Sequence, residues 1–471
     1  MNKHDETVSS LIRQLTNTMS VMQRRIDELE AEVGRLNRVI EQKDMVIADL
    51  RGRLSKYEKP GKNSGNSSVP PSQEPIRDQV VRRTRSLRKP SGRKTGGQPG
   101  HKGHSMDMSR EPDYVTDFRP CVCESCGKSL DGMEGFEHTH SDVVDIVFTT
   151  RITRYRSLSV RCTCGHCNTA NISDGIPSGI SYGPTVRAFV TYLRNVQAIP
   201  YRRTAEIMSE LFRLNMSEGT IRNIEKGMSE KAGYPYEAIR QQIEESRVVG
   251  GDETGAYVNG EHHWFWTFQN QFMTFLFQDR SRGMKAVEAR FPNHFPSSVL
   301  VSDRHSTYMN LTVQSHQACL AHILRNLEYL NELNDGQDWS RRLQELIRES
   351  MAARKSPDAG DLPSMAQSFQ SRLEKLLNED LAHLGKEFES TRNGLRKWAS
   401  SFFTFLKVDG VPPDNNGSER AIRNVRTKTK ISGCFRTEDG ANAFAMIRSI
   451  TDTARKNNQG AFAAIVALGQ L

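Results

Sequence analysis

The sequence lacks any apolar run of about 18 residues, the length that a membrane-spanning helix needs. Apolar residues make up only 36% of the chain, which is below the usual globular average. The first residues, Met1–Asp5, are polar and lead into a charged helical stretch, unlike a secretory signal. We therefore expect no membrane as a partner and a cytoplasmic location.

Cysteine is also scarce. Eight cysteines in a chain of 471 residues are too few for a disulfide scaffold. Six of the eight, however, lie in two tight clusters between residues 121 and 167. In a reducing compartment such clusters indicate metal binding. The length itself predicts several domains, roughly three.

Acidic residues are absent from residues 79–106, in a chain whose net charge is +9 and whose pI is near 9.1. Residues 58–110 begin with turn formers and become strongly basic, so we predict a basic flexible linker that cannot fold alone. A merely solvated linker is the alternative, but we favour contact with DNA phosphates. The expected contacts are Arg82, Arg83, Arg85, Arg88, Arg93, Lys94 and Lys102.

Residues 1–57 carry a heptad repeat of apolar residues, which predicts a leucine-zipper coiled coil. Mostly β-branched residues at a and mostly leucine at d favour a parallel homodimer, although a higher oligomer remains possible. A long helix packed on its own globular body is the alternative. The a positions are Ile12, Met19, Ile26, Val33, Ile40, Ile47 and Leu54, and the d positions are Leu15, Met22, Leu29, Leu36, Lys43, Leu50 and Tyr57.

Residues 111–180 contain two CxxC pairs separated by a β-like stretch, Val143–Val160, with room for a hairpin. This spacing predicts a zinc ribbon in which Zn²⁺ is structural, because protein thiolates fill all four ligand positions. Cys121 and Cys162 each precede a pair by two residues, and they are alternative ligands or spare thiols. The predicted ligands are Cys123, Cys126, Cys164 and Cys167.

Residues 181–245 have helical apolar spacing, with Ser217 as a plausible N-cap of a second helix after a short turn. This pattern predicts a region like a helix-turn-helix motif, and a plain helical support for the next domain is an equally good interpretation. The candidate DNA contacts are Arg202, Arg203 and Arg222.

From residue 246 the pattern changes to strands, which predicts a mixed α/β sheet over residues 246–330. Residues 331–400 are polar and helical and read as an insertion, and residues 401–471 complete the core with C-terminal helices. The fold class is therefore multidomain α+β. The expected strands are Arg247–Gly251, His263–Phe268, Phe272–Gln278 and Ser298–Ser302, with a helix at Met284–Phe291 and a strand-to-helix passage at Gln317–Leu330.

Three carboxylates stand at suitable places in this core: Asp252 and Asp303 at predicted strand ends, and Glu419 near the start of a predicted helix. Such a set can hold two Mg²⁺ ions for phosphoryl transfer, because Mg²⁺ prefers hard oxygen ligands, and Mn²⁺ can substitute. Alone, each acid reads as a turn residue or a salt-bridge partner, and their joint occurrence favours the metal site. Glu253 is expected to point to the other side of its strand.

A basic stripe follows Glu419, and we expect Arg420 and Arg423 to contact the phosphate backbone of DNA. The outer members of this stripe, such as Lys428, fit a solvated helix face equally well. Cys319 and His322 form a CxxH motif, for which we favour a structural or active-site-support role over metal ligation.

Several motifs along the chain form a specific combination. They are the zipper, Lys62–Ser68 with Pro70–Ser72, Gly96–Gly103, the two CxxC pairs, Asp252–Thr254, Cys319–His322, Asn415–Arg420 and the Gly440–Thr453 tail. Read together, they resemble the insertion-sequence-sixty-six family, a branch of the DDE transposases. The resemblance implies a ribonuclease-H-like catalytic domain, DNA transposition, small accessory transposition proteins as partners, and Asp252, Asp303 and Glu419 as the catalytic acids.

The sequence thus predicts a metal-dependent transposase that binds element ends and is associated with the nucleoid. A non-catalytic DNA-binding regulator derived from a transposase is the alternative, and a ribonuclease-H-like nuclease of another pathway is a third possibility. Retention of all three acids argues against the regulator.

Overall fold

The computed structural model describes residues 3–54, 60–63, 65–67, 100, 111–172, 179–355 and 361–470. Two compact units are present. The first comprises Met1–Glu74, Leu324–Glu345 and Leu381–Glu389, and the second comprises Pro75–Ile323, Leu346–Asp380 and Ser390–Leu471. Within the described ranges, no helix has the length and apolar character needed to cross a bilayer.

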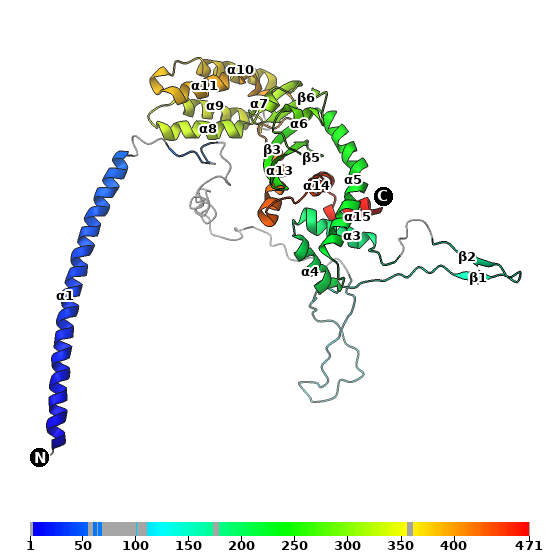
Figure 1. Cartoon of the computed structure of the whole chain (residues 1–471), viewed down its shortest axis with the longest axis horizontal. Helices are drawn as coiled ribbons and strands as arrows, with labels where there is room; N and C mark the ends of the chain where they lie inside the picture. Colours follow the sequence, from blue (N-terminus) through cyan, green and yellow to red (C-terminus); the bar gives the residue numbers. More distant parts are fainter. Residues whose placement is uncertain are drawn as a thin grey trace. The chain divides into compact units, whose positions relative to one another are not determined.

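The N-terminal heptads form one continuous helix, α1, Lys3–Leu54 (Figure 1). The described side chains of this helix, residues 16–44 and 46–47, are all exposed. Ile26 and Leu29 in the apolar seam are 47% and 50% exposed, so the single chain leaves the seam uncovered. The helix is confirmed, and its pairing with a second copy remains a prediction.

The polar motif after α1 differs from the linker that its composition predicts. Asn66 and Ser67 are buried, and the Asn66 amide accepts a bond from the backbone N–H of Asn63 at 2.8 Å. Asn66 also donates to Glu332 on helix α8, Leu320–Leu333, while Lys62 lies over the ring of Tyr329 at 5.3 Å. The turn therefore docks on α8 through side-chain hydrogen bonds, which local composition does not reveal.

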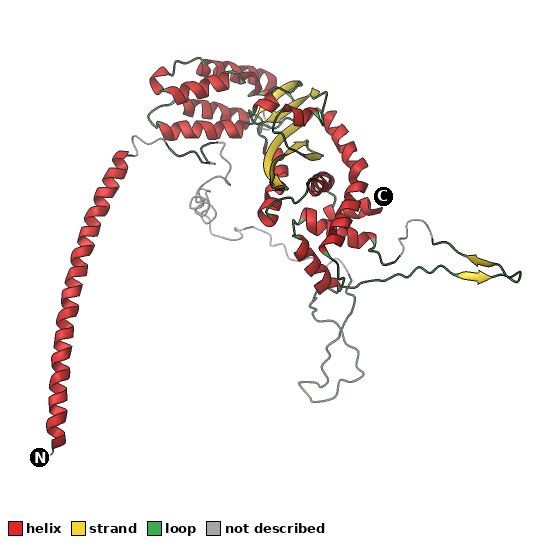
Figure 2. Ribbon diagram, in the orientation of Figure 1, coloured by secondary structure: helices red, strands yellow, loops and turns green. Residues whose placement is uncertain are grey.

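A five-stranded sheet in the order β5-β4-β3-β6-β7 forms the centre of the second unit (Figure 2). Within this sheet β4 pairs antiparallel with both β3 and β5, whereas β6 pairs parallel with both β3 and β7. The strands are β3 Val248–Val258, β4 Glu261–Gln269, β5 Thr274–Asp279, β6 Phe295–Ser302 and β7 Val313–Ala318. The mixed sheet is confirmed, as are the four predicted strands, helix α6, Met284–Glu288, and the passage from β7 into α8.

The prediction that Asp252 ends its strand is wrong. The strand β3 continues to Val258, where it pairs with Glu261 across the turn to β4. Gly250, Gly251 and Gly255 have low intrinsic strand propensity, which made the strand look shorter than it is. Pairing with β4 along the whole length supplies the backbone hydrogen bonds that stabilise it.

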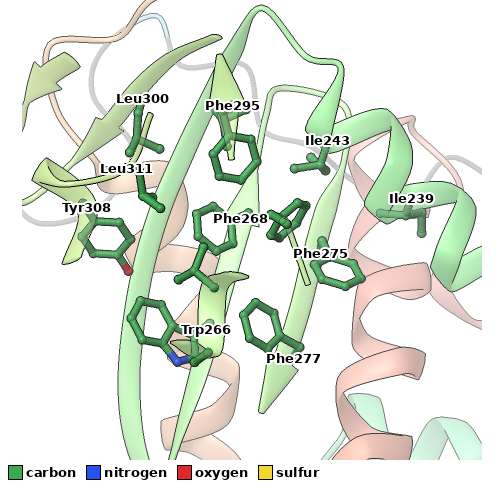
Figure 3. Packing of buried hydrophobic residues seen from close by; sticks show 14 of the residues in the cluster. Ile239, Ile243, Trp266, Phe268, Phe275, Phe277, Phe295, Leu300, Tyr308 and Leu311 are labelled. Atoms are coloured by element: carbon green, nitrogen blue, oxygen red, sulfur yellow. The ribbon is translucent and has the colours of Figure 1, made fainter. Parts of the chain in front are cut away.

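Both faces of the sheet are covered by apolar side chains. On one face, aromatic residues of β4 and β5 pack with helix α5, Glu218–Glu244, and with Tyr308 and Leu311 (Figure 3). On the other face, Phe265 and Leu276 pack against α13, Asn416–Ser432, and α14, Glu438–Lys456. Burial on both faces holds the sheet rigidly and so positions the residues that it carries.

The helices expected at residues 181–245 are present, and their core is shared with the C-terminal helices. Ile447 of α14 and Ile465 of α15, Ala461–Gln470, pack in the same cluster as Met208 and Ile221. Ser217 caps α5 by accepting a bond from Thr220 N–H at 3.1 Å, as predicted. The other elements are α3 Pro184–Thr191, the π-helix η2 Tyr192–Val196 and α4 Tyr201–Phe212.

The predicted insertion is helical, and its described part contains several short elements. Phe369 and Phe403 pack with ring centroids 5.7 Å apart and join the second helix of this region to the aromatic segment that follows it. The break predicted at residues 355–360 falls largely outside the described residues. The elements after α8 are α9 Trp339–Ala353, α10 Leu362–Leu377, η3 Ala382–Leu384, α11 Lys386–Arg396, η4 Ala399–Ser401 and α12 Thr404–Lys407.

Residues 111–172 contain little regular structure. The strands are β1, Ser159–Arg161, and β2, Cys167–Thr169, which form a hairpin around the second cysteine pair. No strand occupies residues 143–158, so the expectation of β-structure across Val143–Val160 is mostly wrong. The side chains of that stretch are exposed, and β-branched residues without a face to bury gain little from pairing.

Candidate functional site

Asp252 lies on β3, and Asp303 directly follows the neighbouring parallel strand β6. Gly250 of β3 pairs with Val301 of β6, and each acid follows two residues later. Asp303 comes directly after the last residue of β6, as predicted, and its Oδ1 accepts a bond from His305 N–H at 2.9 Å. The parallel register thus brings the first two predicted acids together.

Glu419 approaches Asp252 from the helix that crosses this face of the sheet. A Cβ on Gly250 would lie 2.6 Å from Oγ of Ser418, so β3 and the first turn of α13 are in close contact. Thr254, also on that face, accepts a bond from Arg426 of α13 at 3.0 Å. Because side chains alternate along a strand, Asp252 faces α13 as well.

Asn415 fixes the start of α13 on β3. Its Nδ2 donates to the carbonyl of Gly251 at 2.6 Å, directly before Asp252 in the chain. Its backbone N–H donates to Sγ of Cys319 at 3.2 Å, which ties the same loop to the start of α8. In the sequence, Asn415 stands out only as part of the motif that carries the family resemblance, and its role is visible only where β3 and α13 come together.

The three acids form a half-buried cluster of like charge. Burial, followed by repulsion from Glu253, Asp303 and Glu419, raises the pKa of Asp252 well above its usual range. Burial and then the charge of Glu253 raise the pKa of Asp303. Such a cluster has carboxylate oxygens and an excess of negative charge, so its donor set fits hard divalent cations.

Glu253 belongs to the opposite face of β3, as predicted. Its carboxylate accepts bonds from the Tyr308 hydroxyl at 2.6 Å and from Arg282 at 2.8 Å. The Arg282 guanidinium also lies 4.5 Å from the ring of Trp264. Glu253 is therefore engaged in a buried structural contact that adds negative charge close to the acid cluster.

Cys319 and His322 lie beside Glu419. Their ligand atoms and a carboxylate oxygen of Glu419 all fall within 4.8 Å of one another, and His322 Nδ1 is 3.7 Å from Glu419 Oε1. Burial raises the pKa of the Cys319 thiol to about 11, which makes it a neutral hydrogen-bond acceptor for Asn415. This arrangement fits support of the acid cluster, and the same three groups could also hold a softer cation.

The basic residues divide into exposed and buried ones. Arg420 and Arg423 on α13 are exposed, as are Arg202, Arg203 and Arg222 in the helical region. Lys428 is only 5% exposed and donates to the carbonyl of Arg194 at 3.3 Å, so it is not part of a solvated or DNA-facing stripe. The predicted DNA contacts Arg82, Arg83, Arg85, Arg88, Arg93, Lys94 and Lys102 lie outside the described residues.

The first cysteine pair opens a tight turn. The N–H of Cys123 donates to the carbonyl of Lys128 at 2.9 Å, and that of Gly127 donates to Cys123 at 2.9 Å. Bonds from the backbone N–H groups of Cys126 and Ser125 lower the pKa of the Cys123 thiol. Stabilisation of a thiolate by N–H groups fits metal ligation.

The second cluster has a similar turn, but it opens at Cys162. The N–H of Cys162 donates to the carbonyl of His166 at 2.8 Å. A bond from the N–H of Cys164 lowers the pKa of the Cys162 thiol. Cys167 begins β2 instead. Over residues 111–172 the structure does not gather the two predicted pairs into one ligand cluster, so the four-thiolate site stays a prediction with Cys162 as a strong alternative ligand.

Comparison with known proteins gives two matches to protein families. The family described as Transposase IS66 family matches residues 179–443, which is more than half of the chain and includes all three acids. A family of unknown function, DUF6444, matches residues 17–107, which include most of α1 and the basic segment. No curated protein shows a significant match.

Proposed function

Because the chain belongs to the IS66 transposase family, we propose that it is a DNA transposase that binds element ends, cleaves them and joins them to a target. One observation carries the proposal. Asn415 and Ser418 seat α13 on β3, so that Glu419 joins Asp252 and Asp303 in one cluster of like charge. The strand order, with three antiparallel strands followed by two parallel ones, supports a ribonuclease-H-like catalytic domain.

The three acids would hold two Mg²⁺ ions, or Mn²⁺ in their place. When bound, such a pair activates the attacking oxygen and stabilises the leaving one. Water first attacks the phosphodiester at the element end, which breaks the P–O3′ bond and leaves a 3′-hydroxyl. That hydroxyl then attacks a phosphate of the target and displaces its 3′-oxygen. Asp252 would serve both ions, a role supported by the effect that the charges of both Asp303 and Glu419 have on its pKa.

The exposed arginines are proposed to position DNA near this cluster. Arg420 and Arg423 extend from the helix that carries Glu419, so their guanidinium groups can contact backbone phosphates close to the reacting bond. The basic segment and the exposed side of α4 and α5 would bind the flanking DNA. The zipper would pair two chains, and hence two element ends, in a protein that works at the nucleoid and that accessory proteins could assist.

The first experiment is a cleavage and joining assay on labelled element-end DNA with a plasmid target and Mg²⁺. Metal-dependent nicking followed by joined product is the expected result. Nicking without any joining would instead indicate a nuclease of another pathway. Binding to the ends with no cleavage in Mg²⁺ or Mn²⁺ would contradict the proposal and favour the non-catalytic regulator.

Zinc removal is expected to unfold residues 111–180 and to leave the sheet folded, because a structural zinc site contributes folding free energy that is absent without the metal. The full chain should contain about one zinc ion, and Cys123→Ser should lose most of it. Melting profiles with and without chelator, together with zinc content, test this expectation. Comparing Cys162→Ser with Cys167→Ser identifies the fourth ligand, and an unchanged melting profile after chelation would refute the zinc site.

A further inference from the structure

Gln269, the last residue of β4, lies between β3, which carries Asp252, and α13, which carries Glu419. A Cβ on Gly250 would be 2.6 Å from its Nε2, and a Cβ on Gly417 would be 2.7 Å from the same atom. Gly250 precedes Asp252 by two residues, and Gly417 precedes Glu419 by two. The Gln269 amide is therefore a spacer between β3 and α13, and the two glycines leave room for it in this position.

Lys456 fixes the orientation of this amide. Its Nζ donates to Oε1 of Gln269 at 2.6 Å, and also to the carbonyls of Asn270 at 2.6 Å and Met273 at 2.8 Å. An ammonium group has three protons, and these three acceptors use all of them. With Oε1 held by Lys456, Nε2 must point toward α13, where it donates to Oγ of Ser418 at 3.4 Å.

The contacts span three parts of the chain. Lys456 ends α14, Gln269 ends β4, and Ser418 lies in the first turn of α13 and is fully buried. A first-turn residue cannot shift without moving the next one, so the position of Ser418 determines that of Glu419. Burial lowers the pKa of Lys456 to about 8, and the side chain is still mostly charged near pH 7.

We propose that Gln269, oriented by Lys456, is a positioning residue that sets the separation of Glu419 from Asp252. This inference rests on the proposed function, since the separation matters only if the acids share divalent ions. Gln269 itself touches neither the acids nor the DNA in this role. Residues that orient metal ligands typically change metal affinity or activity about 10- to 100-fold when they are removed.

The test measures Mn²⁺ binding to the full-length, zinc-loaded protein, with electron paramagnetic resonance as the readout of bound and free Mn²⁺. Gln269→Ala is expected to weaken Mn²⁺ binding about tenfold and to slow cleavage, with unchanged affinity for DNA. Gln269→Met keeps the volume without the hydrogen bonds, and it should show most of the same loss.

Gln278→Ala is the matched control. Gln278 on β5 is a buried amide that contacts His263 of β4 at 2.7 Å and donates to Asn442 of α14 at 3.1 Å, and neither of these bonds involves α13. A purely structural effect would lower the melting temperature of both variants alike, but only Gln269→Ala should lose Mn²⁺ affinity.

Three results would overturn the inference, and they are distinguishable. If the wild type binds Mn²⁺ more tightly than Asp252→Asn but Gln269→Ala binds like the wild type, the positioning role is wrong and the proposed function stands. The positioning role is also wrong if Gln278→Ala weakens binding equally. If the wild type and Asp252→Asn bind Mn²⁺ equally, the metal chemistry of the proposed function is wrong, and the inference falls with it.

Discussion

Asp252→Asn is expected to abolish DNA cleavage while leaving DNA binding intact. Asp252 is the member of the cluster that experiences the charges of Asp303 and Glu419 together, so its loss would disturb both proposed ion positions. We expect the cleavage rate to fall about 10³-fold or more, which corresponds to a loss of roughly 4 kcal/mol of transition-state stabilisation. Single-turnover nicking of labelled element ends measures this loss, and a binding assay on the same DNA measures affinity.

The loss should not arise from unfolding. In the metal-free protein, repulsion within the cluster opposes folding of the charged form, so removing one charge should keep or raise the melting temperature. Glu261→Gln, at the exposed first residue of β4 opposite the far end of β3, is the matched control and should cleave normally. Cleavage by Asp252→Asn at the wild-type rate would exclude the acid cluster as the catalytic site.

Leu29→Asp is expected to convert the protein from a dimer to a monomer. Leu29 occupies a d position and is 50% exposed on the single helix, so its apolar surface is available to a partner. Burying one leucine side chain stabilises the dimer by about 1.5–3 kcal/mol, and a symmetric dimer buries two such side chains, one from each chain. The change should therefore weaken dimerisation by about 10²- to 10⁴-fold, which sedimentation equilibrium measures.

Ala31→Asp provides the comparison for this prediction. It introduces the same side chain into the same helix, at an f position on the side away from the seam, so effects on helix propensity and charge are matched. This variant should remain dimeric and should pair two element ends in one complex. If Leu29→Asp dimerises as the wild type does, the seam of α1 is not the dimer interface.

The agreement between sequence and structure is closest where the pattern is local. The heptads of α1, the apolar runs of β4, β5 and β6, and the capping of α5 by Ser217 follow from residues near one another in the chain. Hydrophobic periodicity records which face of an element is buried, and it does so without knowledge of the partner. The same reasoning failed at Val143–Val160, where β-branched residues have no surface to cover.

By itself the sequence predicted which three acids come near one another, the helix that carries Glu419 and the turn at the first cysteine pair, because residue type and spacing are properties of short segments. Only the tertiary structure decided how the acids are held. Asn415 and Gly251 are 164 residues apart in the chain, and Lys456 and Gln269 are 187 apart. The docking of Asn66 on Glu332 and the burial of Lys428 are of the same kind. Such contacts depend on which polar groups burial brings within hydrogen-bonding distance, and no local pattern contains that information.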